Sequence, residues 1–136
     1  MGAPQFPDDP KVERVLAVYD ALQRRDWRAL QREVAQVAVL RIGGRSRYAG
    51  VYQGLGQLVA LAVQIEERIV PFQSEIDELT LRGGEVHAVV TVSIRVPPKD
   101  VFRTQLRETF LFDDEGRVAE LMVRGVDQRA LDQFLG

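Results

Sequence analysis

The N-terminal part of the chain carries apolar residues at helical spacing. In residues 10 to 24 the apolar positions recur at intervals of three and four: Val12, Val15, Leu16, Tyr19 and Leu22. Polar residues fill the positions between them, as in a helix with one buried face. Asp9 followed by Pro10 is a typical helix start, with a capping side chain and a preset first turn. The pattern therefore predicts an amphipathic helix over residues 10 to 24.

Two more helices are predicted in the first 71 residues. Asp26 is expected to cap a short second helix, and three residues give it an apolar stripe: Trp27, Leu30 and Val34. Residues 37 to 42 then read as an extended segment that ends at Gly43-Gly44. The third helix has its apolar positions between residues 58 and 69 and is predicted to end at Pro71, because proline cannot continue a helix.

After the third helix the apolar pattern changes to a period of two, which is typical of strands. Four long strands are predicted, over residues 73 to 82, 85 to 96, 102 to 112 and 117 to 126. The segments between them are rich in Gly, Pro and Asp and read as tight turns, so the strands form an antiparallel meander. Asp127 is expected to cap a short final helix. The fold class is therefore α+β, with the three N-terminal helices covering the concave face of a strongly curved antiparallel sheet.

The length of 136 residues fits one domain with one hydrophobic core. Residues 1 to 9 are rich in proline and polar groups, and we expect a flexible N-terminal arm there. Residues 10 to 136 are expected to form the single domain. No internal repeat or linker interrupts this region.

Composition and charge exclude several classes of function. The net charge of -2 does not attract nucleic acid, so no nucleic-acid partner is expected. The chain has no cysteine, and its one histidine, His87, is predicted on the outer face of the sheet. We therefore expect no metal site and no cofactor. No segment reaches the ~18 apolar residues of a membrane span, so no membrane partner is expected, and the chain reads as cytoplasmic.

One acid lies on the apolar face of a predicted strand. In residues 102 to 112, alternate positions share one face: Phe102, Thr104, Leu106, Glu108, Phe110 and Phe112. A buried carboxyl needs either a partner or a proton, because desolvation raises the pKa of a Glu. Glu108 is therefore our candidate catalytic residue, as a proton carrier. The alternative is a structural role, in which a hidden Arg or hydroxyl, or water at a strand end, satisfies the carboxyl.

Four stretches of the chain together carry a resemblance to a known family: YDALQRRDW at residues 19 to 27, YAG at 48 to 50, FLFDDEGRV at 110 to 118, and Asp127 with Leu131. Their order and spacing resemble the nuclear transport factor two-like superfamily, in particular its SnoaL-like branch. That branch includes polyketide cyclases and is related to ketosteroid isomerases. The resemblance implies a cone-shaped barrel with a deep apolar pocket, and usually a homodimer packed through the outer face of the sheet.

The same resemblance assigns residues to the pocket. In ketosteroid isomerases an acid on the third of the four long strands helps to bind the oxyanion, and Glu108 looks like its match. The isomerase's proton-abstracting Asp is matched by Ile42, and its oxyanion-binding Tyr by Val18. Tyr19 lies about 100° around the helix from Val18, so it is not expected simply to take over that role. Steroid isomerisation is therefore not expected, whereas the acid-base work of a SnoaL-like cyclase needs an acid that Glu108 supplies.

Further residues are candidates for ligand binding. An aromatic rim with hydroxyl donors is predicted from Tyr19, Trp27, Tyr48 and Tyr52, with core or edge packing as the alternative for each. The apolar wall of the pocket is predicted from Ile42, Val90, Val92, Ile94, Leu106, Phe110 and Val123. Three arginines near the glycine turn, Arg41, Arg45 and Arg47, either attract an anionic ligand tail or form a solvated loop. Arg124 is expected to point outward, toward the dimer surface or solvent.

Two functional hypotheses follow from the sequence. In the first, the protein is a small-molecule-binding or assembly module without catalysis, and Glu108 is only a polar anchor. The absence of a base at Ile42 favours this hypothesis. In the second, Glu108 performs acid-base chemistry of the cyclase or isomerase type on an apolar, polyketide-like or terpenoid-like substrate.

Overall fold

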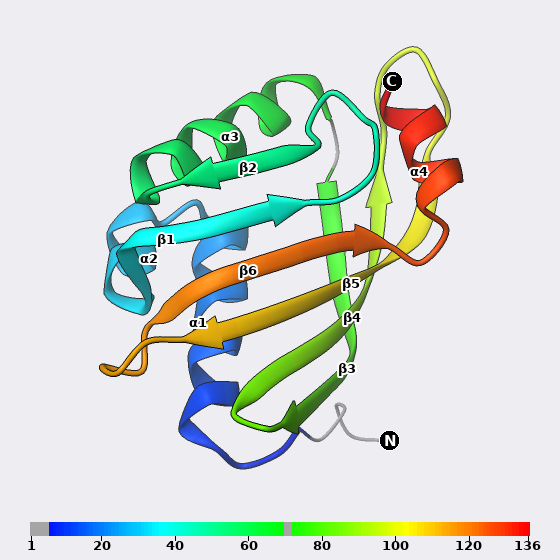
Figure 1. Ribbon diagram of the computed structural model, residues 1–136. Helices are drawn as coiled ribbons and strands as arrows, with labels where there is room; N and C mark the ends of the chain where they lie inside the picture. Colours follow the sequence, from blue (N-terminus) through cyan, green and yellow to red (C-terminus); the bar gives the residue numbers. More distant parts are fainter. Residues whose placement is uncertain (1–5, 70–71) are drawn as a thin grey trace.

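A strongly curved sheet of six strands forms one layer of the molecule, and helices lie against its concave face (Figure 1). The computed structural model describes residues 6–69 and 72–136. The helices are α1 (Pro10–Arg24), α2 (Trp27–Glu33), α3 (Leu55–Arg68) and α4 (Gln128–Leu135). The strands are β1 (Val34–Ile42), β2 (Gly50–Gln53), β3 (Phe72–Arg82), β4 (Glu85–Ile94), β5 (Phe102–Phe112) and β6 (Val118–Gly125). The predicted α+β fold class is confirmed.

The strand order in the sheet is β2-β1-β6-β5-β4-β3. The four long strands β3 to β6 are antiparallel neighbours, as the meander predicts. Strand β1 pairs in parallel with β6, and β2 pairs antiparallel with β1, so the sheet is not antiparallel throughout. The alternation of residue types identifies a strand but not its partner, and β2 is too short to show any period.

The predicted helix starts correspond to real caps. The side chain of Asp9 accepts a hydrogen bond from the backbone N–H of Lys11, and Asp26 and Asp127 each accept one from the N–H three residues later. Each cap satisfies one N–H that the first turn of a helix leaves without a partner. The helix α3 begins three residues before the predicted start, behind Gly54. The predicted stop at Pro71 and residues 1 to 5 of the predicted arm lie outside the described residues.

The core lies between α1 and the concave face of the sheet. On β4 the residues alternate between fully buried and half-buried along the whole strand. The largest fully buried side chains come from α1, β4 and β5: Val12, Val15, Val86, Val90 and Phe110. Packing on this face therefore fixes which side of β5 points inward. In the described part of the chain, no helix is both long and apolar enough to cross a membrane.

Candidate functional site

A cavity with a volume of about 250 Å³ lies between the helices and the concave face of the sheet. Its lining combines residues from α1, α3 and the sheet: Val18, Leu22, Leu58, Leu61, Ala62, Ile65, Val92, Ile94, Leu106, Glu108, Phe110 and Val123 are among them. Several lining side chains, such as Ile65, Leu106 and Leu121, pack on the core yet are only partly buried. Their accessible surface opens into the cavity, so this apolar space is not filled by the protein itself.

Glu108 brings a carboxyl group to the wall of this apolar cavity. In the sheet it lies beside Ala88 of β4 and Val123 of β6, neither of which offers a polar side chain. The Tyr19 hydroxyl from α1 donates a hydrogen bond to Oε1 of Glu108, and the tyrosine ring packs edge-on against Phe110 with 5.7 Å between ring centroids. The hidden hydroxyl that the structural alternative requires is therefore present, and Tyr19 supplies it.

Burial changes the ionisation of both partners. The pKa of Glu108 is raised above its ordinary value chiefly by desolvation, and the hydrogen bond from Tyr19 partly offsets that rise. The pKa of Tyr19 is also raised, first by burial and then by the charge and hydrogen bond of Glu108. Tyr19 therefore stays protonated and donates, while the carboxyl is shifted toward its neutral form. A neutral carboxylic acid has an O–H of its own, which can donate to an oxygen of a ligand.

The structure brings many of the predicted site residues to the cavity. The candidates that line it are Ile42, Tyr48, Val92, Ile94, Leu106, Glu108, Phe110 and Val123. Tyr19 is not among the lining residues and reaches the site through its hydrogen bond to Glu108.

Three of the remaining candidates lie elsewhere. Val90 is only 1% exposed and belongs to the packed core. Trp27 packs against the core from α2, and Tyr52 donates a hydrogen bond from its hydroxyl to the carbonyl of Tyr48 at 2.7 Å. None of these three residues lines the cavity. Trp27 and Tyr52 pack against the core, as the alternative for the aromatic residues describes, and Val90 is part of the core.

The position of Tyr19 differs from the sequence expectation. Val18 and Ile42, the matches of the isomerase's Tyr and Asp, do line the cavity, but as apolar wall. Tyr19 projects from the helix about 100° away from Val18. Its long side chain nevertheless reaches Glu108, 89 residues later in the chain. The helix turns Val18 and Tyr19 about 100° apart, but the tyrosine side chain is long enough for its hydroxyl to contact Glu108.

Sequence reasoning did not assign the cavity residues of α3. This helix contributes Leu58, Leu61, Ala62 and Ile65 to the wall. Their helical spacing was the available signal, but it does not distinguish a side chain that faces a cavity from one that faces a packed core. Ser46, the only buried polar residue among those described, also lines the cavity, and its hydroxyl accepts from the N–H of Tyr48.

Arg41 at the end of β1 and the arginines of the loop after it do not present a free arginine cluster to the cavity. The Arg41 side chain forms an ion pair with Glu120 on β6, with 2.6 Å between Nε and Oε1. At Arg45 the backbone N–H donates to the Asp132 carboxylate, which ties the loop to α4. None of the three arginines is among the residues that line the cavity. Across residues 6–69 and 72–136, no group of three or more His, Asp or Glu side chains could hold a metal ion.

Comparisons with known proteins define the fold. No family model and no curated protein matches the chain. Among solved structures, Bal32a from a soil-derived mobile gene cassette is 21% identical with a TM-score of 0.85, covering 93% of this chain and 96% of that chain. An NTF2-like protein from Burkholderia xenovorans LB400 is 21% identical with a TM-score of 0.79, covering 93% and 95%. TerC, co-crystallized with polyporic acid, is 13% identical with a TM-score of 0.83, covering 93% and 98%.

These matches show that the protein has the nuclear transport factor two-like fold. Other neighbours include an epoxide hydrolase of the LEH-like type from M. tuberculosis and a protein from Catenulispora acidiphila with a ketosteroid isomerase-like fold. The predicted resemblance is confirmed at the level of the fold. Because the fold hosts unrelated activities, function must be argued from the cavity itself.

Proposed function

We propose that this protein is a SnoaL-like small-molecule-binding protein that takes a mostly apolar ligand into the cavity and lacks ketosteroid isomerase activity. The proposal assigns this role to a single domain over residues 10 to 136. The observation that carries it is the unfilled apolar cavity with one half-buried, hydrogen-bonded polar pair, Glu108 and Tyr19, at its wall. Apolar walls with a few placed polar groups are the usual composition of small-molecule sites.

The lining argues for an apolar and compact ligand. Among the described residues that line the cavity, only Glu108 and Arg124 carry charge. The volume of about 250 Å³ lies just below the range of roughly 300 to 1,000 Å³ that is common for drug-sized ligands. A terpenoid-like molecule or a small polyketide-like molecule with one oxygen directed at Glu108 fits this combination best.

Two structural neighbours support a ligand-binding role by analogy. TerC was co-crystallized with polyporic acid, and the Catenulispora protein was crystallized in complex with trimethylamine. Both share the fold of this chain at low sequence identity, so their ligands do not transfer to it. They illustrate that small molecules are bound by proteins with this architecture.

Ile42 supports the exclusion of steroid isomerisation. The isomerase needs a carboxylate at the matching position to abstract a proton, and Ile42 lines the cavity with a hydrocarbon side chain. The one carboxyl that does line the cavity belongs to Glu108, which accepts a hydrogen bond from Tyr19. Its position matches the oxyanion-binding acid of the isomerase and not the proton-abstracting base.

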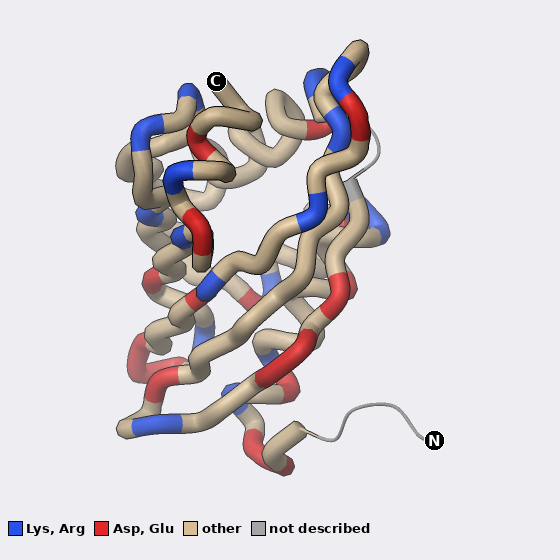
Figure 2. The backbone as a smooth tube through the Cα atoms, turned by 90° about the vertical axis from the view of Figure 1, so that its right-hand side faces the viewer, with Lys and Arg blue, Asp and Glu red and all other residues tan. Residues whose placement is uncertain are grey.

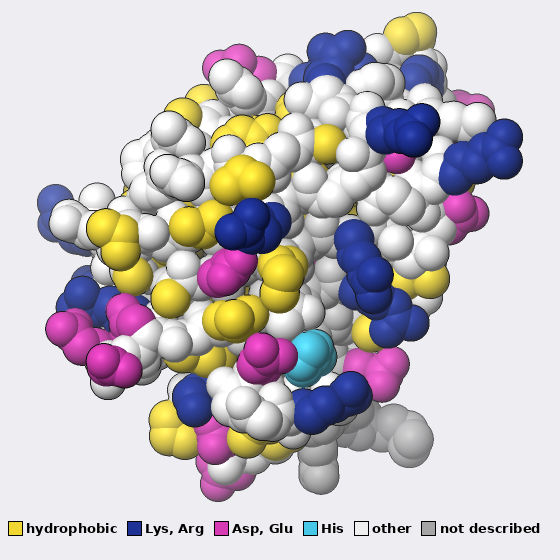
Figure 3. All heavy atoms as spheres, in the orientation of Figure 1, with side chains coloured by type: hydrophobic (Ala, Val, Ile, Leu, Met, Phe, Trp, Pro, Cys, Tyr) yellow, Lys and Arg dark blue, Asp and Glu magenta, His cyan; other side chains and the backbone are white. Residues whose placement is uncertain are grey.

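The proposal includes a homodimer through the outer face of the sheet and a cytoplasmic location. Half-buried or exposed apolar side chains on this face, Val89, Leu111 and Met122, supply part of a contact surface. Figure 3 looks onto this face and shows exposed apolar side chains among charged ones. Along the described chain, basic and acidic positions are interspersed (Figure 2), which together with the net charge of -2 disfavours a nucleic-acid partner.

The second candidate function is acid-base catalysis through Glu108 on an apolar, polyketide-like or terpenoid-like substrate. The observation that favours it is the Tyr19–Glu108 hydrogen bond inside a cavity where the pKa of Glu108 is raised. In this arrangement a neutral Glu108 donates a proton or hydrogen bond to a developing oxyanion, with Tyr19 fixing the carboxyl. The reaction would be an acid-base step of the type that cyclases and isomerases catalyse.

Filling the cavity tests the binding proposal. Ala62 lines the cavity from α3, and the next residue, Val63, is 39% exposed on the same helix. We expect wild-type protein to bind at least one probe from a panel of geraniol, limonene and menadione in tryptophan-fluorescence and NMR titrations. Ala62→Phe should abolish that binding because the new ring occupies the space, whereas Val63→Phe should leave it unchanged. The proposal fails if Ala62→Phe, folded as judged by its amide spectrum, binds as wild type does.

The catalytic alternative is tested with Glu108→Gln, which retains the shape and an acceptor oxygen but has no acidic proton. If the wild type converts a bound probe and the variant binds it without conversion, Glu108 is catalytic. Binding that survives in both proteins, with no conversion by either, supports the non-catalytic function.

A further inference from the structure

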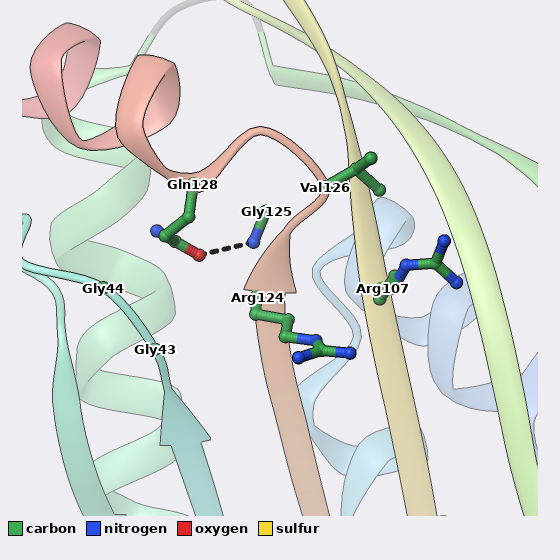
Figure 4. Close-up of a pocket in the computed structure, with 7 residues that line it drawn as sticks. All are labelled: Gly43, Gly44, Arg107, Arg124, Gly125, Val126 and Gln128. Carbon is green, nitrogen blue, oxygen red and sulfur yellow. Dashed lines mark hydrogen bonds between the residues drawn. The ribbon is translucent and has the colours of Figure 1, made fainter.

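The outer face of the sheet carries a hollow with a volume of about 440 Å³ that shares part of its lining with the cavity. Figure 4 shows the residues that line it: Gly43, Gly44, Arg107, Arg124, Gly125, Val126 and Gln128. We propose that this hollow binds the oxyanion group of a small organic acid, a carboxylate or a phosphate ester, between the guanidinium groups of Arg107 and Arg124. The hollow adjoins the cavity, since Gly43, Arg124, Gly125 and Gln128 line both, but the anion site does not depend on the function proposed for the cavity.

The two arginines are brought together by the strand register. Arg107 of β5 and Arg124 of β6 are direct partners in the antiparallel ladder, so their side chains leave the same face of the sheet side by side (Figure 4). Like charges directly opposite each other destabilise a strand pair. An anion held between them removes that repulsion, which gives the pair a preference for an anionic ligand.

Protein carboxylates do not neutralise this pair. Among the ion pairs and side-chain hydrogen bonds of the described residues, none involves the guanidinium of Arg107 or Arg124. Three acids of β6 and α4 have other partners: Glu120 pairs with Arg41, Asp132 accepts from Gln128 and from the N–H of Arg45, and Asp127 caps α4. The two guanidinium groups therefore retain their donors for an outside partner.

Glycines provide the room beside the arginines. Gly43 follows β1 next to Arg124, where a Cβ would make only an ordinary van der Waals contact of 3.5 Å with the Arg124 Cβ, so the requirement for glycine lies at Gly44. At Gly44, with φ of +88°, a Cβ would collide with the Gln128 side-chain amide. That amide is itself fixed, because its oxygen accepts from the N–H of Gly125 at 2.6 Å and its nitrogen donates to Asp132 (Figure 4). The floor of the hollow is thus held in place.

The lining also indicates the kind of acid. The planar fork of a guanidinium matches the two oxygens of a carboxylate or phosphate. Val126, which is 48% exposed, adds an apolar edge to the hollow. An organic acid with a small apolar body therefore fits better than a bare inorganic ion. In a single copy of the chain the site is open to solvent, so we expect millimolar affinity that weakens as salt is added. The proposal requires that the homodimer proposed above leave Arg107 and Arg124 uncovered at its edge.

The test is an amide NMR titration of the full chain with two probes, inorganic phosphate and benzoate. We expect saturable shifts at Gly43, Gly125 and Val126 with at least one probe. Benzoate should bind more tightly than phosphate, because an organic acid with an apolar body fits the lining better. Arg124→Gln should weaken that binding at least about fivefold, and Arg124→Lys should weaken it less, because the charge remains while the fork is lost.

The matched control is Arg103→Gln. Arg103 lies on the same outer face of β5, four residues before Arg107, and opposite Ser93 rather than another arginine. The Arg103→Gln substitution also removes one positive charge. Binding should stay within about twofold of wild type because Arg107 and Arg124 are both retained. Should Arg124→Gln fail to fold, Arg107→Gln carries the same expectation.

Three results would overturn the site: shifts that do not saturate, an equal loss in Arg103→Gln, or unchanged binding in Arg124→Gln. A fourth would do so as well. If neither probe binds, but Arg107→Gln and Arg124→Gln turn a dimer into a monomer by light scattering, the arginines serve carboxylates of a second copy. Binding of apolar probes in the cavity is measured in Arg107→Gln, because Arg124 lines the cavity and Arg107 does not. That binding should not change in this variant, and it reports separately on the function proposed above.

Discussion

The two faces of β5 provide opposite environments for two neighbouring charged residues, Glu108 and Arg107. Glu108 points to the concave side, where it lies in apolar surroundings and accepts a hydrogen bond from Tyr19. Arg107, one residue earlier, points to the convex side, where its cross-strand neighbour is another arginine. A buried charge without a partner costs several kcal/mol, whereas an exposed one remains hydrated by water. The inner face therefore needs Tyr19, and the outer face tolerates the arginine pair.

The comparison suggests where the protein can change. Substitutions on the inner face should be costly because they alter packing or leave a buried group without a partner. On the outer face, the same strand should accept changes with little loss of stability, and binding can vary there without affecting the fold.

The largest expected difference between the faces is in packing. Phe110 is fully buried on the inner face, and Leu111, the next residue, is half-buried on the outer face. Phe110→Ala should lower the free energy of unfolding by about 3 to 5 kcal/mol, because it removes a buried ring and leaves a void. Leu111→Ala should cost only about 1 kcal/mol. Urea unfolding of both variants measures this, and comparable losses would contradict the assignment of the two faces.

A smaller effect is expected from removing the partner of the buried carboxyl. Tyr19→Phe retains the ring that contacts Phe110 but removes the hydroxyl that donates to Glu108. The loss should be about 1 to 3 kcal/mol at neutral pH, the cost of a buried polar group left unsatisfied. Since that hydrogen bond lowers the pKa of Glu108, the variant should show a still higher pKa for this carboxyl by NMR titration. Tyr52→Phe, which removes a hydroxyl outside the cavity, is the control.

Glu108→Gln should have the smallest effect on the free energy of unfolding at low pH. The difference from the wild type should grow as the pH rises. The folded-state pKa of Glu108 is raised above 4.5, so the folded protein holds this proton more tightly than the unfolded chain does. Its stabilising effect is complete below the unfolded pKa and is lost as the pH rises through the folded pKa. Gln cannot ionise and still offers an oxygen to Tyr19, so at low pH the two proteins should differ by less than about 1 kcal/mol.

As the pH rises, the wild type should lose stability relative to Glu108→Gln. Urea unfolding at a series of pH values from 4 upward measures the difference. Arg107→Gln, on the outer face, should run parallel to the wild type over the same series. A constant difference between wild type and Glu108→Gln would mean that the carboxyl is not desolvated.

Much of the fold follows from local patterns. The caps at Asp9, Asp26 and Asp127 and the turns between the long strands depend on residues close together in the sequence, so the helix α1 and the strand β5 begin and end where predicted. The position of β1 beside β6 does not follow from such patterns, because it joins segments about 80 residues apart. The short strand β2 has too few residues to show a period.

The candidate site divides in the same way. Alternation along β5 places Glu108 inside and Arg107 outside, and both placements are predictable. Trp27, Tyr52 and Val90 have the right residue types for a pocket wall but pack elsewhere, because composition does not tell a cavity from a packed core. The wall from α3 is missed for the same reason.

The sequence by itself determined which side of each element is apolar and therefore that one carboxyl faces the interior. Only the tertiary structure decided that Tyr19, 89 residues away, meets that carboxyl, and that Arg107 and Arg124 stand side by side on the other face. The physical reason is that periodicity is a property of neighbouring residues along the chain, whereas hydrogen-bond partners and strand register depend on how distant segments pack together.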